Sequence, residues 1–250
     1  MKSETSYTIY SRKELKKIQI NENLLNEMLD IISSYYPLKN VFKKIAIQHI
    51  ENADSLILAR QKNKLVGISV SSVTKMRTPF KLYKIPVIFQ RMLFLDPHSL
   101  YRKTGTLLMT HTFKQLMGHF WFLKPFVLIG RTQNPVVLKM LTRFTEYYPK
   151  PEEVLPKKIK DFVQLLLPML HAKKLEENGC LAGSLSAFKD MDYTKIWNEY
   201  FYHKKNPFNE MVLSSAFKIK NNKIINSGSF LILLGYSKPF NFVRFSSVKI

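Results

Sequence analysis

The sequence predicts an α/β protein in which helices flank a mixed, mostly antiparallel central sheet, and three observations lead to this prediction. The 250 residues are 46% hydrophobic and 23% charged, which is typical of a globular chain with a sizeable core. Helical and strand periodicities alternate in the order βααββ and then βαβα. No repeat with a period of roughly 20 to 50 residues is visible, so solenoids and propellers are excluded.

The first part of the chain is expected to hold three strands and two helices. Apolar residues recur at helical spacing in both helices, and β-branched residues are frequent in the second strand of a hairpin. The basic, proline-marked segment 74–79 is expected to be a loop. The expected ranges are 7–10 for a strand, 22–34 and 38–49 for helices, and 55–60 and 65–73 for the hairpin.

The middle part is predicted to be a buried strand, a helix, a second buried strand and a second helix. The stretch 85–95 is almost wholly apolar, as in a strand that is covered on both faces. A helix over 104–117 follows after a short loop, and 126–129 is again a strand. Asn134 and Pro135 then start a helix, because Asn is a favoured cap and Pro is favoured at the first helical position.

The composition changes after Tyr148, where three prolines mark a connection. We predict a core over 1–148, a helical insertion or subdomain over 149–209, and C-terminal strands over 210–250 that complete the sheet. Within the last two parts, helices are expected at 159–170 and 186–201, and strands at 211–219 and 229–236.

The net charge of +21 is large enough to attract nucleic acid, anionic lipid or a phosphorylated small molecule. No motif supports nucleic acid, and no cysteine or histidine spacing predicts a metal site. Because Cys180 is the only cysteine, an intramolecular disulfide is excluded and a cytoplasmic location is expected. The sequence shows no signal peptide and no apolar run that predicts a transmembrane span.

The strongest chemical signal is the crossover in which the strand ending at Leu95 leads through the loop 96–103 to Gly105 at a helix start. The first N–H groups of a helix have no partner within it and lie at the positive end of its dipole, so this position suits a diphosphate. We expect glycine here because a side chain would hold the anion away from the backbone. Arg102 and Lys103 add positive charge beside it.

The segment Arg102-Lys103-Thr104-Gly105-Thr106-Leu107 resembles the acyl-CoA motif of the GNAT superfamily of N-acetyltransferases, Gln/Arg-x-x-Gly-x-Gly/Ala, with Leu107 at the last position. The element order over 7–144 is similar to the βααβββαβα core of that family. The resemblance implies a GNAT-like sheet with splayed strands, and acetyl-CoA or another acyl-CoA as cosubstrate without a metal. The residues that it assigns to the acyl-CoA are Phe94, Leu95, Arg102, Lys103, Thr104, Gly105, Thr106 and Asn134.

The activity that the resemblance implies is direct transfer of an acetyl group from acetyl-CoA to a primary amine of a small molecule or protein. Positioning and electrostatics do most of the work in such a transfer, and a backbone N–H at 92–94 would hold the developing oxyanion. The tyrosine that many family members carry about seven residues after Asn134 is replaced by Leu141. Asp96 and Tyr147 are therefore the candidate catalytic residues.

Two alternatives stay open. The charge also fits a non-catalytic basic module that binds nucleic acid or an anionic membrane surface. A GNAT-like fold that binds CoA without turnover is the second alternative. A homodimer is compatible with the sequence.

Overall fold

The computed structural model describes residues 5–16, 22–97, 104–183 and 186–240, and its contacts divide the chain into two compact units. Unit 1 consists of residues 1–74, 88–124 and 242–250, and unit 2 of residues 75–87 and 125–241. This division does not follow the expected boundary after 148. The reason lies in unit 2, where β11 (Phe230–Ser237) returns to pair with β5 (Phe126–Thr132) from the middle of the chain.

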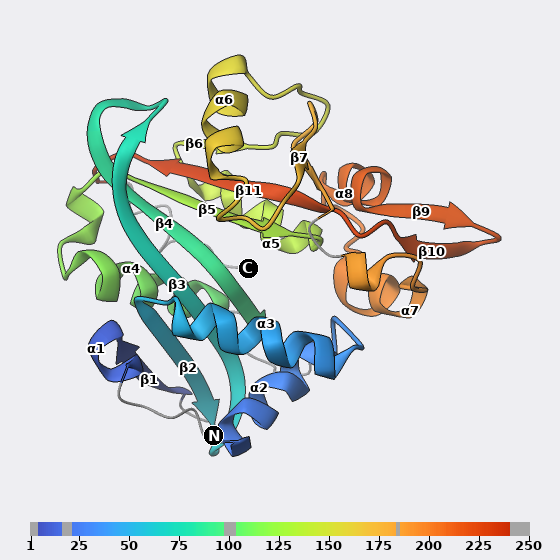
Figure 1. Ribbon diagram of the computed structural model, residues 1–250, viewed down its shortest axis with the longest axis horizontal. Helices are drawn as coiled ribbons and strands as arrows, with labels where there is room; N and C mark the ends of the chain where they lie inside the picture. Colours follow the sequence, from blue (N-terminus) through green and yellow to red (C-terminus); the bar gives the residue numbers. More distant parts are fainter. Residues whose placement is uncertain (1–4, 17–21, 98–103, 184–185, 241–250) are drawn as a thin grey trace. The chain divides into compact units, whose positions relative to one another are not determined.

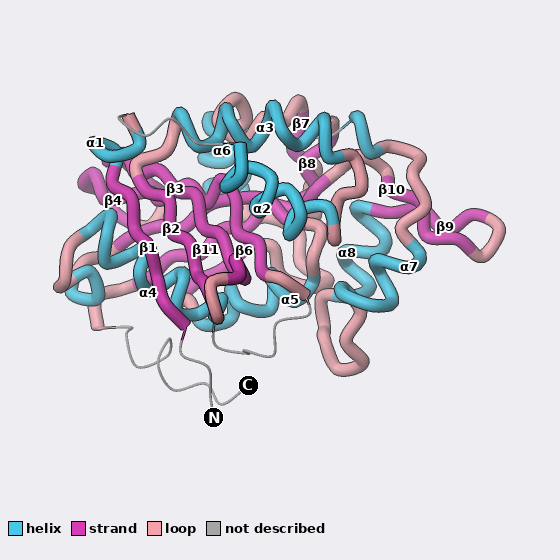
Figure 2. The backbone as a smooth tube through the Cα atoms, turned by 90° about the horizontal axis from the view of Figure 1, so that it is seen from below, coloured by secondary structure: helices cyan, strands magenta, loops and turns pink. Residues whose placement is uncertain are grey.

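The elements at the start of the chain follow the order that the resemblance implies, with one short helix added. Their bounds are β1 (Thr5–Ser11), α1 (Arg12–Leu15), α2 (Glu22–Ser33), α3 (Lys39–Glu51), β2 (Ser55–Gln61), β3 (Lys64–Thr78), β4 (Lys81–Leu95), α4 (Thr104–Met117) and the 3-10 turn η1 (Trp121–Leu123). The strands run in the spatial order β1-β2-β3-β4. β2 pairs antiparallel with both β1 and β3, and Figure 2 shows α3 and α4 on opposite sides of these strands.

The alternation of side chains along β2 explains this layering in unit 1. Ile57 and Ala59 share one face, where they pack with Val66 and with Leu108 of α4 in an apolar cluster. The intervening Leu56 is 1% exposed on the other face. Because both faces of the strand are covered, the predicted α/β class with flanking helices is confirmed.

The expected loop at 74–79 is wrong, because β3 continues to Thr78 and β4 begins at Lys81. Only Pro79 and Phe80 form the turn of this long hairpin, which Figure 1 shows in blue-green. The two strands are hydrogen-bonded neighbours, so each provides the backbone partners of the other. This pairing keeps the segment in a strand although its polar, basic sequence favours a loop. The end of the hairpin, residues 75–87, belongs to unit 2.

Unit 2 is built around β11, all of whose residues are buried. One edge of β11 pairs antiparallel with β5, and the other edge pairs antiparallel with β6 and β8 in turn. The further bounds are α5 (Pro135–Met140), η2 (Leu141–Arg143), β6 (Glu146–Tyr148), α6 (Lys157–Leu166), β7 (Lys174–Leu175), β8 (Cys180–Ala182), η3 (Ser186–Phe188), α7 (Thr194–Ile196), the π-helical η4 (Trp197–Phe201), α8 (Asn209–Ala216), β9 (Phe217–Lys220) and β10 (Lys223–Asn226).

Three expectations for the second half need correction. The insertion 149–209 is not purely helical, because β7 and β8 pair within the sheet. The helix expected at 186–201 is three short pieces, with Asp190 in the left-handed region between them at a φ of 67°. The strand expected at 211–219 is mostly the helix α8, because Val212 and Ala216, four residues apart, are both fully buried. In the part of the chain that the structure describes, no helix has the length and apolarity to cross a membrane.

Candidate functional site at the start of α4

The start of α4 in unit 1 packs closely against the end of β4. A Cβ atom placed on Gly105 would lie 3.1 Å from Cδ1 of Leu95, and one placed on Gly67 would lie 3.1 Å from Cδ2 of the same leucine. The side chain of Leu95 is therefore held between two glycines. The missing side chain of Gly105 points toward Leu95, so packing of the helix on the strand explains this glycine, and the expectation that it clears room for an anion needs correction.

The first turn of α4 has the charge and length that favour an anion. The helix runs for 14 residues and carries no acidic residue in its first turn, as is also true of α3, α5, α6 and α7, whereas α1, α2 and α8 each have one acid there. Thr104 and Gly105 are buried, Thr106 is half-buried, and Leu107 is 41% exposed. The outer side of this turn is thus formed by Thr106 and Leu107. Arg102 and Lys103 lie outside the described residues.

The side chains at the end of β4 are used in packing. The ring of Phe94 meets the rings of Tyr36 and Phe42 edge-on, at centroid distances of 6.0 and 6.2 Å. The carbonyl of Leu95 accepts a hydrogen bond of 2.9 Å from the hydroxyl of Tyr35. Because the Phe94 ring is used in packing, a contact of Phe94 with an acyl-CoA would involve its backbone, and the assignment of Phe94 and Leu95 to the acyl-CoA stays a prediction.

Gln90, on the same strand, is the centre of a polar network. Its Nε2 donates to the Met92 carbonyl at 2.6 Å and to Ser69 Oγ at 3.1 Å, and its Oε1 accepts from Ser71 Oγ at 3.1 Å. Ser69 Oγ in turn lies 2.8 Å from Thr112 Oγ1 of α4. The network ties β3, β4 and α4 together. Sequence reasoning missed it because its partners lie far apart along the chain and no local pattern links them.

Asp96 and Tyr147, the two candidate catalytic residues, belong to different units. Asp96 is 8% exposed, its Oδ2 lies 2.7 Å from Nζ of Lys64, and its N–H donates to the carbonyl of Val66 at 2.9 Å. This carboxylate is thus held in an ion pair at the base of the hairpin. Tyr147 is half-buried on β6 in unit 2, with its ring 6.4 Å from that of Phe208.

Asn134 caps α5, as the sequence predicts. Its Oδ1 accepts a hydrogen bond of 2.8 Å from the N–H of Val136, and Pro135 occupies the first helical position. The N–H of Asn134 donates to Thr132 Oγ1 at 3.0 Å. The local sequence therefore satisfies the groups that a helix start leaves unpaired, and the remaining capacity of Asn134 is its side-chain amide NH₂.

Among the residues that the structure describes, Cys180 and His111 do not add a second reactive centre. Burial raises the pKa of the Cys180 thiol to about 11, so it stays protonated at neutral pH and is a poor nucleophile. Burial lowers the pKa of His111 on α4, and nearby Lys114 adds to the effect. Throughout the described ranges, no three His, Cys, Asp or Glu side chains gather as metal ligands would.

No protein-family model matches the chain, and no curated protein matches it. Solved structures similar to it include the aminoglycoside N-acetyltransferase AAC(6')-Iy in complex with CoA (12% identity, 44% of this chain and 68% of that chain, TM-score 0.33). Others are a GNAT family acetyltransferase of Staphylococcus aureus (17%, 43% and 74%, TM-score 0.30) and ElaA of Escherichia coli (16%, 60% and 95%, TM-score 0.34). The family printed for the Staphylococcus aureus structure is the one that residues 102–107 resemble.

Proposed function

We propose that this protein is an acyl-CoA-dependent N-acyltransferase that transfers an acetyl group from acetyl-CoA to a primary amine. The observation that carries the proposal is the junction of β4 and α4, where a strand end and the acid-free start of a 14-residue helix are held together through Leu95 and Gly105. The amides of the first turn would bind the diphosphate of the CoA. The half-exposed Leu107 marks the outer side of that turn.

Acetyl-CoA supplies the thioester, from which the amine nitrogen takes the acyl carbon while the carbon–sulfur bond breaks and the sulfur leaves with a proton. The contribution of this chain is positional. Gln90 fixes the Met92 carbonyl at 2.6 Å and so holds the conformation of β4, whose backbone N–H groups are the donors proposed for the acyl oxygen. Asp96 and Tyr147 stay proposed catalytic residues, and Asn134 a proposed contact of the CoA.

The substitution Leu107→Glu tests the diphosphate site without disturbing the core. A carboxylate in the first turn favours the helix dipole, so the melting temperature should hold or rise. It repels each negative charge of a bound diphosphate by about 2 kcal/mol at roughly 8 Å and an effective dielectric of about 20, so acetyl-CoA affinity should fall by at least about thirtyfold. Isothermal titration measures the affinity. Gln115→Glu, which makes the same charge change on the exposed part of α4, is the matched control.

Equal acetyl-CoA affinities for Leu107→Glu and Gln115→Glu would show that the diphosphate does not bind at the start of α4. A thioester-consumption assay over a panel of amines then separates an enzyme from a CoA-binding protein without turnover. Asp96→Asn and Tyr147→Phe should each lower turnover while acetyl-CoA affinity is retained. If either variant keeps full turnover, that residue is not catalytic.

A further inference from the structure

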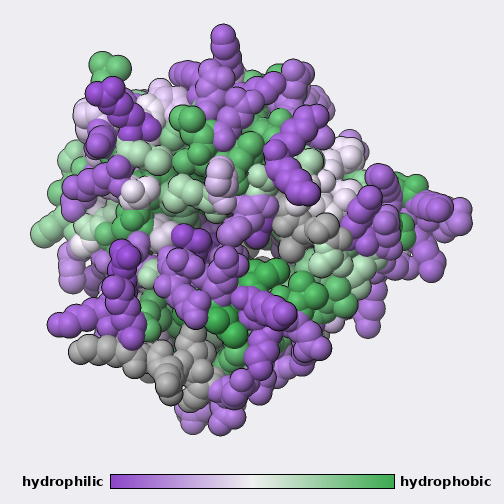
Figure 3. Space-filling model, in the orientation of Figure 1, coloured by the Kyte–Doolittle hydropathy of each residue, from purple (hydrophilic) through white to green (hydrophobic). Residues whose placement is uncertain are grey.

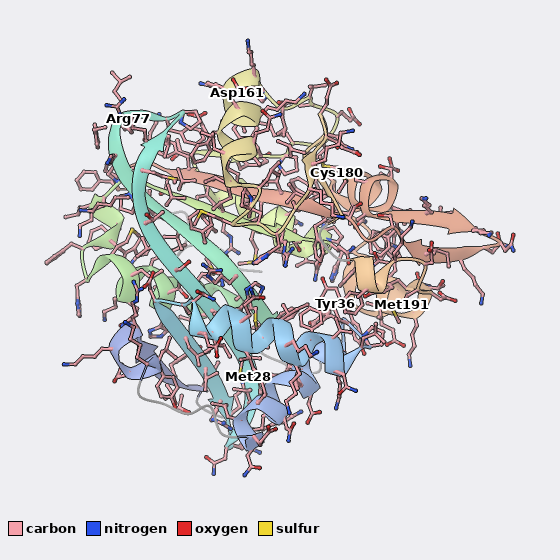
Figure 4. The ribbon with its side chains drawn as sticks, viewed as in Figure 1. Met28, Tyr36, Arg77, Asp161, Cys180 and Met191 are labelled. Carbon is pink, nitrogen blue, oxygen red and sulfur yellow. The ribbon has the colours of Figure 1, made fainter. Side chains whose placement is uncertain are left out.

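The end of the β3–β4 hairpin in unit 2 combines strong positive charge with exposed apolar side chains. Residues 75–87 contain four cations and no acid. Lys75, Arg77 and Lys84 are exposed, and Figure 4 places Arg77 at the end of the hairpin. Among the residues that the structure describes, no carboxylate forms an ion pair with any of the four. The hairpin end therefore presents uncompensated charge.

Two adjacent apolar residues share this surface. Leu82 is 96% exposed and Tyr83 is 58% exposed. Adjacent residues of a strand point to opposite faces, so Leu82 projects from the face of Lys84, and Tyr83 from that of Lys81, whose Nζ lies 5.9 Å from the tyrosine ring centroid. Figure 3 shows hydrophobic atoms projecting among hydrophilic ones at the upper left, over the end of this hairpin. Each face thus pairs an apolar group with a cation.

The hairpin end is anchored within unit 2. The ring of Phe80 at the turn stacks on that of Tyr236 at a centroid distance of 4.6 Å and an interplanar angle of 1°. Tyr236 lies on the fully buried strand β11 and is itself 2% exposed. Because Phe80 is used in this anchor, Leu82 and Tyr83 are left as the apolar groups available to a partner.

We propose that residues 75–87, which we name the basic hairpin tip, dock on an anionic lipid surface. A bilayer interface supplies phosphates for the cations and an apolar boundary for Leu82, and tyrosine is favoured at that depth. Nucleic acid would satisfy the cations but leave an aliphatic side chain in water. The charge complementarity and the exposed Leu82 together select the lipid. This inference is independent of the acetyltransferase proposal.

The β9–β10 hairpin of the same unit is a natural control. It also carries three lysines and the 67% exposed Ile219, but its turn is Asn221-Asn222, and Lys223 is paired with Asp192 at 3.3 Å. Its cations are thus partly compensated and its turn is polar. If general charge attracted the protein to lipid, the two hairpins would contribute alike.

Sedimentation with vesicles tests the proposal on the full chain. Binding is expected to vesicles of equimolar phosphatidylcholine and phosphatidylglycerol and not to phosphatidylcholine alone. Lys81→Gln with Lys84→Gln should lower the partition coefficient about thirtyfold, at about 1 kcal/mol for each cation. Leu82→Ser should lower it about tenfold. Lys218→Gln with Lys220→Gln in the control hairpin should lower it less than threefold.

Three outcomes would overturn the proposal. The first is absence of binding to the anionic vesicles. The second is an equal loss of the partition coefficient in the control variant Lys218→Gln with Lys220→Gln. The third is displacement from the vesicles by a single-stranded RNA that binds the basic hairpin tip more tightly than the vesicles do. Thermal melting shows that each variant is folded, and because all the substituted side chains are exposed apart from the half-buried Lys81, unfolding is not expected.

Discussion

The helices α4 and α5 each follow a strand of the central sheet, but they begin by different physical means. α5 begins through its own sequence, since Asn134 caps it and Pro135 removes a donor that would otherwise need a partner. α4 begins through packing, since Gly105 lies against Leu95. The two helix starts therefore differ in their capacity to bind an anion. Both first turns are free of acid, but α5 has only six residues and its first turn is satisfied by Asn134 and Pro135, whereas α4 runs for 14 residues.

The largest effect is expected where packing sets the helix start. Gly105→Val places a branched side chain where a Cβ alone would lie 3.1 Å from Leu95, and overpacking of this kind typically costs about 2 kcal/mol of unfolding free energy. Denaturant unfolding measures the loss. Gln115→Val on the exposed side of α4 should cost about 0.5 kcal/mol, from helix propensity alone. A similar loss for the two variants would show that Gly105 is not packed as described.

A smaller effect is expected where a single cap sets the helix start. Asn134→Ala removes the hydrogen bond to the N–H of Val136 and should lower the unfolding free energy by about 1 kcal/mol. Asn134→Asp keeps an acceptor and should retain most of the stability. Unchanged stability of Asn134→Ala would mean that the cap adds nothing.

The two Asn134 variants also test whether Asn134 contacts the CoA. Asn134→Asp retains the cap but loses the side-chain NH₂ donors. If Asn134 contacts the CoA, acetyl-CoA affinity falls in both variants, by about threefold to tenfold for a lost neutral hydrogen bond. If titration shows full acetyl-CoA affinity in Asn134→Asp, Asn134 caps α5 and does not contact the CoA.

The smallest effect is the response of α4 to acid, which α5 should not share because it carries no histidine. Burial lowers the pKa of His111 in the folded state, so below about pH 6.5 the unfolded chain binds the proton more strongly. The unfolding free energy should therefore fall as the pH decreases through this range, and His111→Gln should make that fall shallower. Thermal melts between neutral and mildly acidic pH measure it, and parallel curves would contradict the assignment.

Local chemistry allowed some elements to be predicted and hid others. The start of α5 was predictable because its cap and proline are adjacent in the sequence. The role of Gly105 was not, because Leu95 approaches it only in the folded chain, and a glycine at a helix start reads equally as a phosphate site. The network of Gln90 and the ion pair of Asp96 with Lys64 were hidden for the same reason.

Tertiary contacts also gave two segments a secondary structure other than the one that their local sequence predicts. The segment 74–79 carries charges and a proline that favour a loop, yet a neighbouring strand extends the hairpin through most of it. Residues 211–216 have apolar side chains compatible with either a strand or a helix. Burial of Val212 and Ala216 on one side decides for the helix.

The α/β class, the order of elements up to α5 apart from the short α1, and the positive charge follow from the sequence alone, because periodicity, capping and composition are local or additive properties. Three other features arise only in the folded chain: β11 pairs with β5, Leu95 fills the space beside Gly105, and Leu82 stays in solvent at the end of a hairpin. Those outcomes depend on contacts between residues distant in the chain. Such contacts stabilise the fold only after the chain has met the entropic cost of closing the loops between the contacting residues.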